Sequence, residues 1–139
     1  QLQLTTGADI ALHDITGQIR ACVDESGIRS GFVIVSSRHT TTALAINENE
    51  ARLVEDVKAF LKRLIPPGDR YLHNDIHLRD CPPDEPENAH AHLAAMLLGS
   101  SEAIPVVDGA LALGQYQSVM LYELDGPRER RVGVQVTGE

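Results

Sequence analysis

The last forty residues constrain the fold of this chain most, because strand-like runs alternate there with turn sequences. The runs cover residues 103–107, 110–124 and 128–137. Asp108-Gly109 separates the first two runs, and Asp125-Gly126-Pro127 separates the last two. Asp-Gly between apolar runs is typical of a β-hairpin. We therefore predict an antiparallel meander, which leaves no room for a fold of repeated parallel crossovers.

The first hundred residues add helices to this sheet. Apolar patterns predict strands over residues 2–6, 31–36 and 43–46, with residues 38–42 continuing extended between the last two. Helices are expected from an Asp14 or Thr16 cap to Gly27, from an Asn47 cap to about residue 65, and from residue 88 to about residue 98. We expect one α+β domain over residues 1–139, with about three helices against one face of a largely antiparallel sheet.

The composition narrows the possible partners. A net charge of −8 argues against a nucleic-acid partner, which would require clustered lysines and arginines, but allows a small phosphorylated ligand held by one or two arginines. The compact basic cluster is Arg128, Arg130 and Arg131, which is either an anion site or a solvated strand. The sequence shows no signal peptide and no apolar run of 18 residues, so we expect a cytoplasmic protein without a membrane partner.

Six histidines are the most distinctive candidates for chemistry: His13, His39, His73, His77, His90 and His92. His39 follows a predicted buried strand and precedes three threonines. His73 and His77 lie four residues apart in the irregular stretch 71–87, but the glutamate of an HExxH zinc site is replaced by Asn74. An irregular segment of this length inside a small domain is often functional.

His90 and His92 cannot both face one metal ion, because residues two apart on a helix point about 200° away from each other. His92 precedes the apolar positions 93, 96 and 97, which favours an inward orientation, although periodicity alone leaves His90 open. Three imidazoles from separate elements would form a zinc-type centre with an open fourth position. The alternative is three unrelated histidines.

Several motifs in order along the chain resemble the YjbQ-like family. They are RHTTTALAINE at residues 38–48, YLH at 71–73, NAHAHL at 88–93, LGSSE at 98–102, IPVVDGALALGQYQ at 104–117, ELDGPRER at 123–130 and the closing VTGE. The resemblance implies a sandwich-like half-barrel, a homotrimer, and a metal site at His39, His73 and His92, with His77 and His90 outside the core pattern. Gln115-Tyr116 departs from the family's usual Thr-Trp at these positions.

Family members are named secondary thiamine-phosphate synthases for a weak activity of that kind, so the resemblance implies an enzyme that acts on a small phosphorylated substrate. A three-histidine site favours Zn²⁺ over Mg²⁺, which prefers carboxylates and water, and it therefore also makes a metal-dependent hydrolase a candidate. The candidate catalytic base is Glu48, which is alternatively a first-turn helix acid. Candidate substrate-binding residues are Thr40, Thr41, Asn88, Gln117 and Arg128. The competing hypothesis is a non-catalytic trimer that binds a metal or a metabolite.

Overall fold

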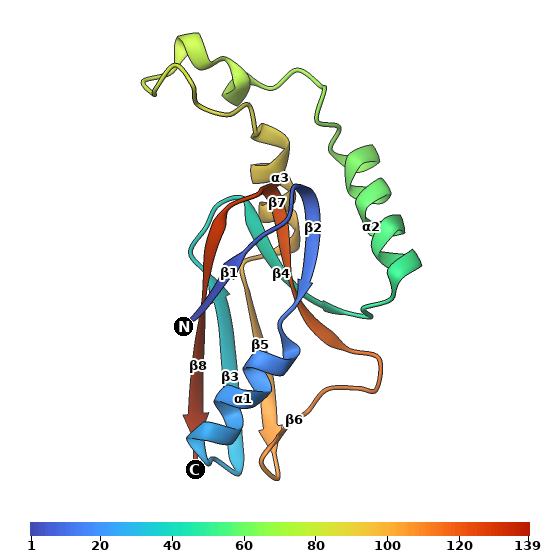
Figure 1. Ribbon diagram of the computed structural model, residues 1–139, viewed down its shortest axis with the longest axis vertical. Helices are drawn as coiled ribbons and strands as arrows, with labels where there is room; N and C mark the ends of the chain where they lie inside the picture. Colours follow the sequence, from blue (N-terminus) through green and yellow to red (C-terminus); the bar gives the residue numbers. More distant parts are fainter.

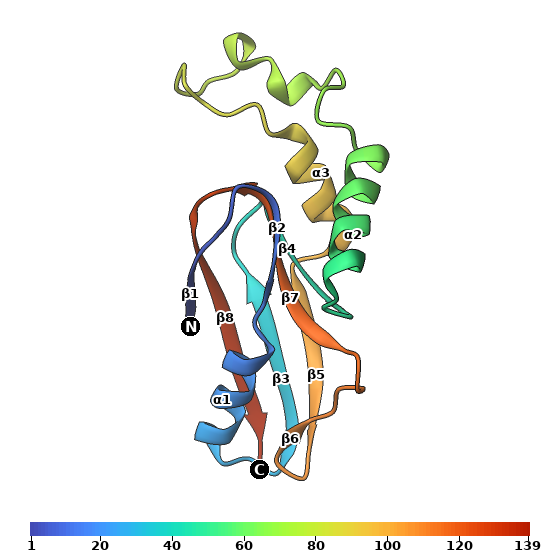
Figure 2. The ribbon, with the colours of Figure 1, turned by 45° about the vertical axis from the view of Figure 1, so that its right-hand side comes forward.

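Two antiparallel sheets form the body of the molecule in the computed structural model, which describes residues 1–139 (Figure 1). The five-stranded sheet has the order β1 (Leu2–Thr5), β8 (Glu129–Gly138), β3 (Ser30–Ser37), β5 (Ser101–Val107) and β6 (Ala110–Leu111). The three-stranded sheet has the order β2 (Asp9–Asp14), β7 (Ser118–Gly126) and β4 (Thr42–Asn47). Every strand pair is antiparallel. The strands curl into a sandwich-like half-barrel, which confirms the predicted fold class (Figure 2).

Three helices complete the fold: α1 (Thr16–Ser26), α2 (Ala51–Leu64) and α3 (Ala89–Leu98). The number agrees with the prediction, but the helices do not share one face. Helices α2 and α3 cover the outer face of the three-stranded sheet, whereas α1 packs against the space between the two sheets. Between α2 and α3 the chain makes two short 3₁₀ turns, η1 (Leu72–Asn74) and η2 (Ile76–Leu78), in a segment that extends beyond the sheets (Figures 1 and 2).

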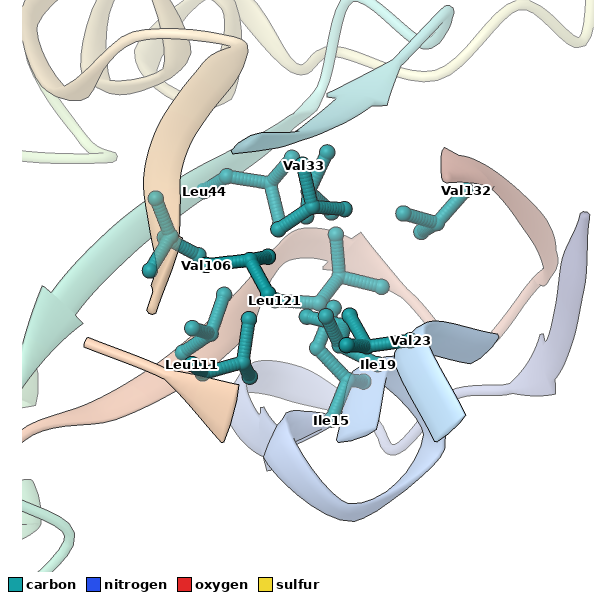
Figure 3. Close-up of a cluster of buried hydrophobic side chains, with 12 residues drawn as sticks. Ile15, Ile19, Val23, Val33, Leu44, Val106, Leu111, Leu121 and Val132 are labelled. Carbon is teal, nitrogen blue, oxygen red and sulfur yellow. The ribbon is translucent and has the colours of Figure 1, made fainter. Parts of the chain in front are cut away.

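Strand β7 belongs to both hydrophobic cores. Val119 and Leu121 point between the sheets, where they meet side chains of α1, β3, β5 and β8 (Figure 3). Met120, Tyr122 and Leu124 point the other way and pack under α2 and α3. Because both faces of β7 are buried, this strand shows no alternation of apolar and polar residues in the sequence.

The predicted meander is wrong in two of its connections. The expected strand over residues 110–124 is divided, because β6 ends at Leu111 and the chain then crosses to the other sheet, where β7 begins at Ser118. Strands β7 and β8 form no hairpin, since β8 pairs with β1 and β3 in the five-stranded sheet. The turn at Asp108 and Gly109 is confirmed, with φ angles of 51° and 80° that suit a tight hairpin between β5 and β6.

Two further predictions need correction nearer the N-terminus, and strand β2 is an element that the sequence patterns do not indicate. The stretch 38–42 does not continue β3, because the chain turns after Ser37 and β4 begins in the other sheet at Thr42. Helix α2 is capped by Glu50 and not by Asn47, since the Glu50 carboxylate accepts the backbone N–H groups of residues 52 and 53. Glu48 therefore precedes the helix and is not a first-turn acid.

The start of α1 carries a prediction about stability. The cap position is Ile15, but Asp14 Oδ1 accepts hydrogen bonds from the backbone N–H and the hydroxyl of Thr16, at 2.9 and 2.6 Å. Burial raises the pKa of Asp14, but these bonds, together with hydrogen bonds from Asn49 and Ser118, outweigh burial and the pKa is lowered. We expect Asp14→Ala to cost about 1 kcal/mol of unfolding free energy. Asp24→Ala, at an exposed position of α1, is the control and should show a smaller loss of unfolding free energy in urea. Equal losses of unfolding free energy in the two variants would contradict the capping role of Asp14.

Candidate functional site

A polar pocket lies where the chain passes from β3 to β4 and where α3 ends. Its volume is about 570 Å³. His39 and Arg38 come from the β3–β4 connection, and His92 comes from α3. The full lining is Ser37, Arg38, His39, Thr40, Thr42, His92, Ala95, Met96, Gly99 and Ser100. We call this cavity the histidine pocket; it brings together residues that are more than fifty positions apart in the sequence.

His73 reaches the same neighbourhood from η1. Its ring meets the ring of His92 edge to face, with centroids 4.7 Å apart and planes at 79°. The structure thus joins His92 to both of the other predicted ligands, to His73 by ring contact and to His39 by a shared pocket. The chain contains no group of three or more histidine, cysteine, aspartate or glutamate side chains that could hold a metal ion.

His39 is already engaged within the chain. Its Nε2 atom accepts a hydrogen bond from the backbone N–H of Arg131, at 3.0 Å. A neutral imidazole that accepts at Nε2 carries its proton on Nδ1, so neither nitrogen offers a free lone pair. His39 must release Arg131 before it can bind a metal ion. The predicted triad is therefore two histidines in ring contact and a third, in the same pocket as His92, whose ring is bound to the backbone of Arg131.

The electrostatic surroundings keep two of these histidines neutral. Burial lowers the pKa of His39, and the positive charges of Arg130, Arg128 and Arg131 lower it further against the opposing effect of Glu123. Burial also lowers the pKa of His92, and His73 adds to this effect while Asp125 opposes it. Both shifts favour the neutral ring, which is the form that binds metals.

The other two candidate histidines lie elsewhere. His90 lines a small apolar cavity between α2 and α3 with Leu61 and Ile65, and its Nδ1 is buried without a hydrogen-bond partner. Its separation from His92 confirms that the two side chains point to different sides of the helix. His77 lines a hollow of the 66–87 segment, well exposed and apart from the histidine pocket.

A buried ion pair supports the connection that carries His39. Glu123 on β7 is 0% exposed and Arg130 on β8 is 5% exposed. Arg130 donates from Nε to Glu123 Oε1 and from Nη2 to Oε2, both at 2.7 Å. Arg130 Nη2 also donates to Thr41 Oγ1 at 2.8 Å, and the Thr6 hydroxyl donates to Glu123. Of the predicted substrate-binding threonines, Thr41 is thus buried in this cluster, whereas Thr40 lines the pocket.

Sequence reasoning missed the role of Glu123. The available signal was a glutamate inside the strongly apolar run 119–124, on the same face of the strand as two core residues. Because a buried carboxylate requires a positive partner, the signal pointed to an arginine on a neighbouring strand. The sequence indicates Arg130 only as a member of the basic cluster at residues 128–131.

Two further predicted residues converge on Asp125. Asn88 Nδ2 donates to Asp125 Oδ2 at 2.7 Å, and Arg128 Nη2 donates to the same oxygen at 2.8 Å. Asp125 acts on the pKa of His92, so this network lies beside the histidine pocket. The substrate-binding roles of Asn88 and Arg128 stay predictions, since both side chains are held within the chain.

Glu48 and Gln117 lie at the opposite end of the three-stranded sheet. Glu48 follows β4 and Gln117 precedes β7, where Asn47 pairs with Ser118. His39 precedes β4, whose six residues span roughly 20 Å. Gln117 Oε1 accepts the backbone N–H of Gly114 at 2.7 Å. Within one chain the structure does not bring these two residues to the histidine pocket.

Comparison with known proteins identifies the family to which the chain belongs. The family model described as UPF0047 protein YjbQ-like matches residues 1–139. The chain belongs to this YjbQ-like family. A UPF0047 protein of Methanothermobacter thermautotrophicus is 42% identical to the YjbQ-like chain over 139 residues, which cover 100% of this chain and 91% of the relative. One from Archaeoglobus fulgidus is 44% identical over 132 residues, which cover 95% of each.

Solved structures agree with the fold of this YjbQ-like chain. A hypothetical protein of Aeropyrum pernix aligns with a TM-score of 0.90 at 38% identity, over 99% of this chain and 96% of that one. A protein of unknown function from Sulfolobus solfataricus aligns with a TM-score of 0.89 at 37% identity, over 99% and 94%. None of the helices of the YjbQ-like chain is both long and apolar enough to cross a membrane.

Proposed function

We propose that this YjbQ-like chain binds a small phosphorylated ligand in the histidine pocket. The observation that carries the proposal is the lining, which combines the Arg38 guanidinium, two neutral imidazoles and several hydroxyl groups. Arginine is suited to phosphate because its planar fork donates two parallel hydrogen bonds. In a chain of net charge −8, a local group of arginines attracts anions to one place.

A zinc ion on His73 and His92 is the second part of the proposal. Their rings are in contact, and imidazole suits Zn²⁺ better than Mg²⁺. The fit is incomplete in this conformation, since His39 donates no free lone pair while its Nε2 accepts from Arg131. The third ligand would be His39 after its ring turns, or water. A bound Zn²⁺ would supply a positive charge for the phosphate.

Assembly into a homotrimer is the third part. Residues 66–87, which we call the arm, reach beyond the sheets and carry Leu72 and Leu78 at 79% and 74% exposure (Figure 2). Two almost fully exposed leucines on an extended segment favour contact with another subunit. The next helix, α3, adds Met96 and Leu97 at exposed positions, so the apolar surface is not confined to the arm.

The choice between an enzyme and a binding protein depends on the same pocket. The thiamine-phosphate synthase activity that the family resemblance implies would direct a pyrophosphate group to these donors. The lining contains no carboxylate, and Glu48 lies at the far end of β4. We therefore propose ligand binding as the function, and a synthase assay on the wild type and on His92→Ala tests for the enzyme.

The metal content of purified protein tests the zinc proposal. We expect His73→Ala and His92→Ala to lower the affinity for Zn²⁺ at least about tenfold, since each change removes a ligand. His77→Ala is the matched control, because His77 lies outside the pocket. Mass spectrometry of zinc-loaded, dialysed protein gives the stoichiometry. The zinc proposal fails if the wild type retains no zinc or if all three variants retain as much as the wild type.

Thermal unfolding in the presence of phosphorylated compounds tests the ligand proposal. A compound at a hundred times its dissociation constant should add about 2.7 kcal/mol to the free energy of unfolding. The effect should diminish in His92→Ala and in Arg38→Gln, which alter the lining of the pocket. Unchanged unfolding with inorganic phosphate, pyrophosphate and a panel of phosphate esters would contradict it.

A further inference from the structure

A second hollow lies on the outer face of the five-stranded sheet, which no helix covers. Its volume is about 450 Å³, and its lining is Gln1, Ile34, Ser36, Arg38, His39, Arg131, Gly133, Val134 and Gln135. We call it the outer hollow. Arg38 and His39 also line the histidine pocket, so the two cavities lie on either side of the same short connection.

The strand register explains why the sheet is hollowed at this place. Ile34 is paired with Gln135, and Ser36 is paired with Gly133, so these positions share one face with Arg131. Gly133 contributes no side chain between Arg131 and Gln135. A Cβ atom added there would lie 3.4 Å from Ser36 Oγ, so a larger side chain would fill the floor of the hollow.

The charges in the outer hollow are not balanced within the chain. Five ion pairs occur in the molecule, and none of them includes Arg38 or Arg131. Neither guanidinium donates a hydrogen bond to another residue, and no aspartate or glutamate lines the hollow. The backbone of Arg131 is fixed by its bond to His39, so this arginine is anchored at the rim.

We propose that the outer hollow is a phosphate-binding subsite, with Arg38 and Arg131 as its charged donors and Ser36 and Gln135 as its neutral ones. Two arginines that line one cavity and form no ion pair within the chain can supply the charged donors for a tetrahedral dianion. The proposal rests on the proposed function and extends it. The ligand of this protein is then a small molecule with two anionic groups, one in the histidine pocket and one in the outer hollow.

Inorganic phosphate is the probe, and calorimetric titration of the zinc-free protein gives the number of sites and their affinities. We expect two phosphate ions per chain in the wild type. Arg131→Gln should weaken one site about tenfold or more, because a charge-assisted donor is lost. Gly133→Val should block the same site sterically while leaving every charge in place, and its melting temperature shows whether the fold is kept. Arg131 is exposed, so Arg131→Gln stays informative if Gly133→Val unfolds.

Arg63→Gln is the matched control, since Arg63 is an exposed arginine on α2 without an ion-pair partner. Retention of both sites by Arg131→Gln would overturn the proposal. Equal weakening of phosphate binding by Arg131→Gln and Arg63→Gln would also overturn the proposal. Such a result would show a general effect of the charge of the chain and not a site at Arg131. His92→Ala should affect only the other site, so a failure of the histidine pocket remains distinguishable from a failure of the outer hollow.

Discussion

Replacing Glu123 with alanine is expected to lower the free energy of unfolding by about 3–5 kcal/mol. The change leaves the Arg130 guanidinium buried at 5% exposure without its carboxylate partner. It also removes the acceptor of Thr6 and of the Asp125 backbone N–H. Urea or guanidinium unfolding, followed by circular dichroism, measures the loss.

The control is the double variant Glu123→Met with Arg130→Met. Replacing both members of a buried ion pair by apolar residues of similar volume is often close to neutral. We therefore expect the double variant to be more stable than either single variant. If Glu123→Ala costs less than about 1 kcal/mol, or if the two single changes are simply additive, the ion pair does not act as a unit.

The same residue sets a pH dependence of stability. Burial raises the pKa of Glu123, but hydrogen bonds from Arg130, Thr6 and the Asp125 N–H outweigh burial, and the pKa is lowered below its ordinary value of 4.5. A lowered folded-state pKa contributes stability that is fully present above the unfolded value and is lost as the pH falls through the folded value. The wild type should therefore lose more stability below about pH 4.5 than the double methionine variant.

The second large effect is expected in the arm. Leu72→Glu together with Leu78→Glu should convert the proposed trimer, with about three times the 15.1 kDa chain mass, into single chains. Both leucines are exposed in the monomer, so the charges do not disturb its core. Light scattering after size-exclusion chromatography measures the mass, and circular dichroism checks the fold.

Phe60→Glu is the control for the arm variants, because Phe60 on α2 is also exposed, at 51%. It should remain trimeric if the arm is the part that contacts a neighbour. A wild type that elutes as a single chain would contradict the trimer proposal itself. Dissociation of the trimer by Phe60→Glu alone would indicate that the contact between subunits involves α2 and not the arm.

Helix ends were predictable because their signals are local. Gly27 ends α1 with a φ of 72°, Gly99 follows α3 with a φ of 99°, and Pro66 follows α2. Glycine accepts positive φ angles without strain, and proline cannot continue a helix. Both residues therefore end helices independently of their tertiary surroundings. The Asp108-Gly109 hairpin belongs to the same class of signal.

Strand pairing was less predictable because it depends on distant residues. Nothing in the run 110–124 marks the place where the chain changes sheets, since Leu111 and Leu113 continue the apolar pattern through the break. Strand β2 is only partly buried and its pattern is weak. For the site, helix geometry separated His90 from His92. Only the fold shows that the backbone N–H of Arg131 donates a hydrogen bond to His39.

Strand β8 pairs with both β1 and β3, and this has a consequence for how the protein is made. Leu2 lies opposite Val132, so β1 cannot pair with its neighbour in the sheet until β8 has been synthesised. Pairings of such long sequence separation slow folding, and unpaired strand edges are prone to aggregate in the meantime. We infer that the nascent chain has no closed five-stranded sheet until β8 has been synthesised, and that β1 stays unpaired while the strands between β1 and β8 are made.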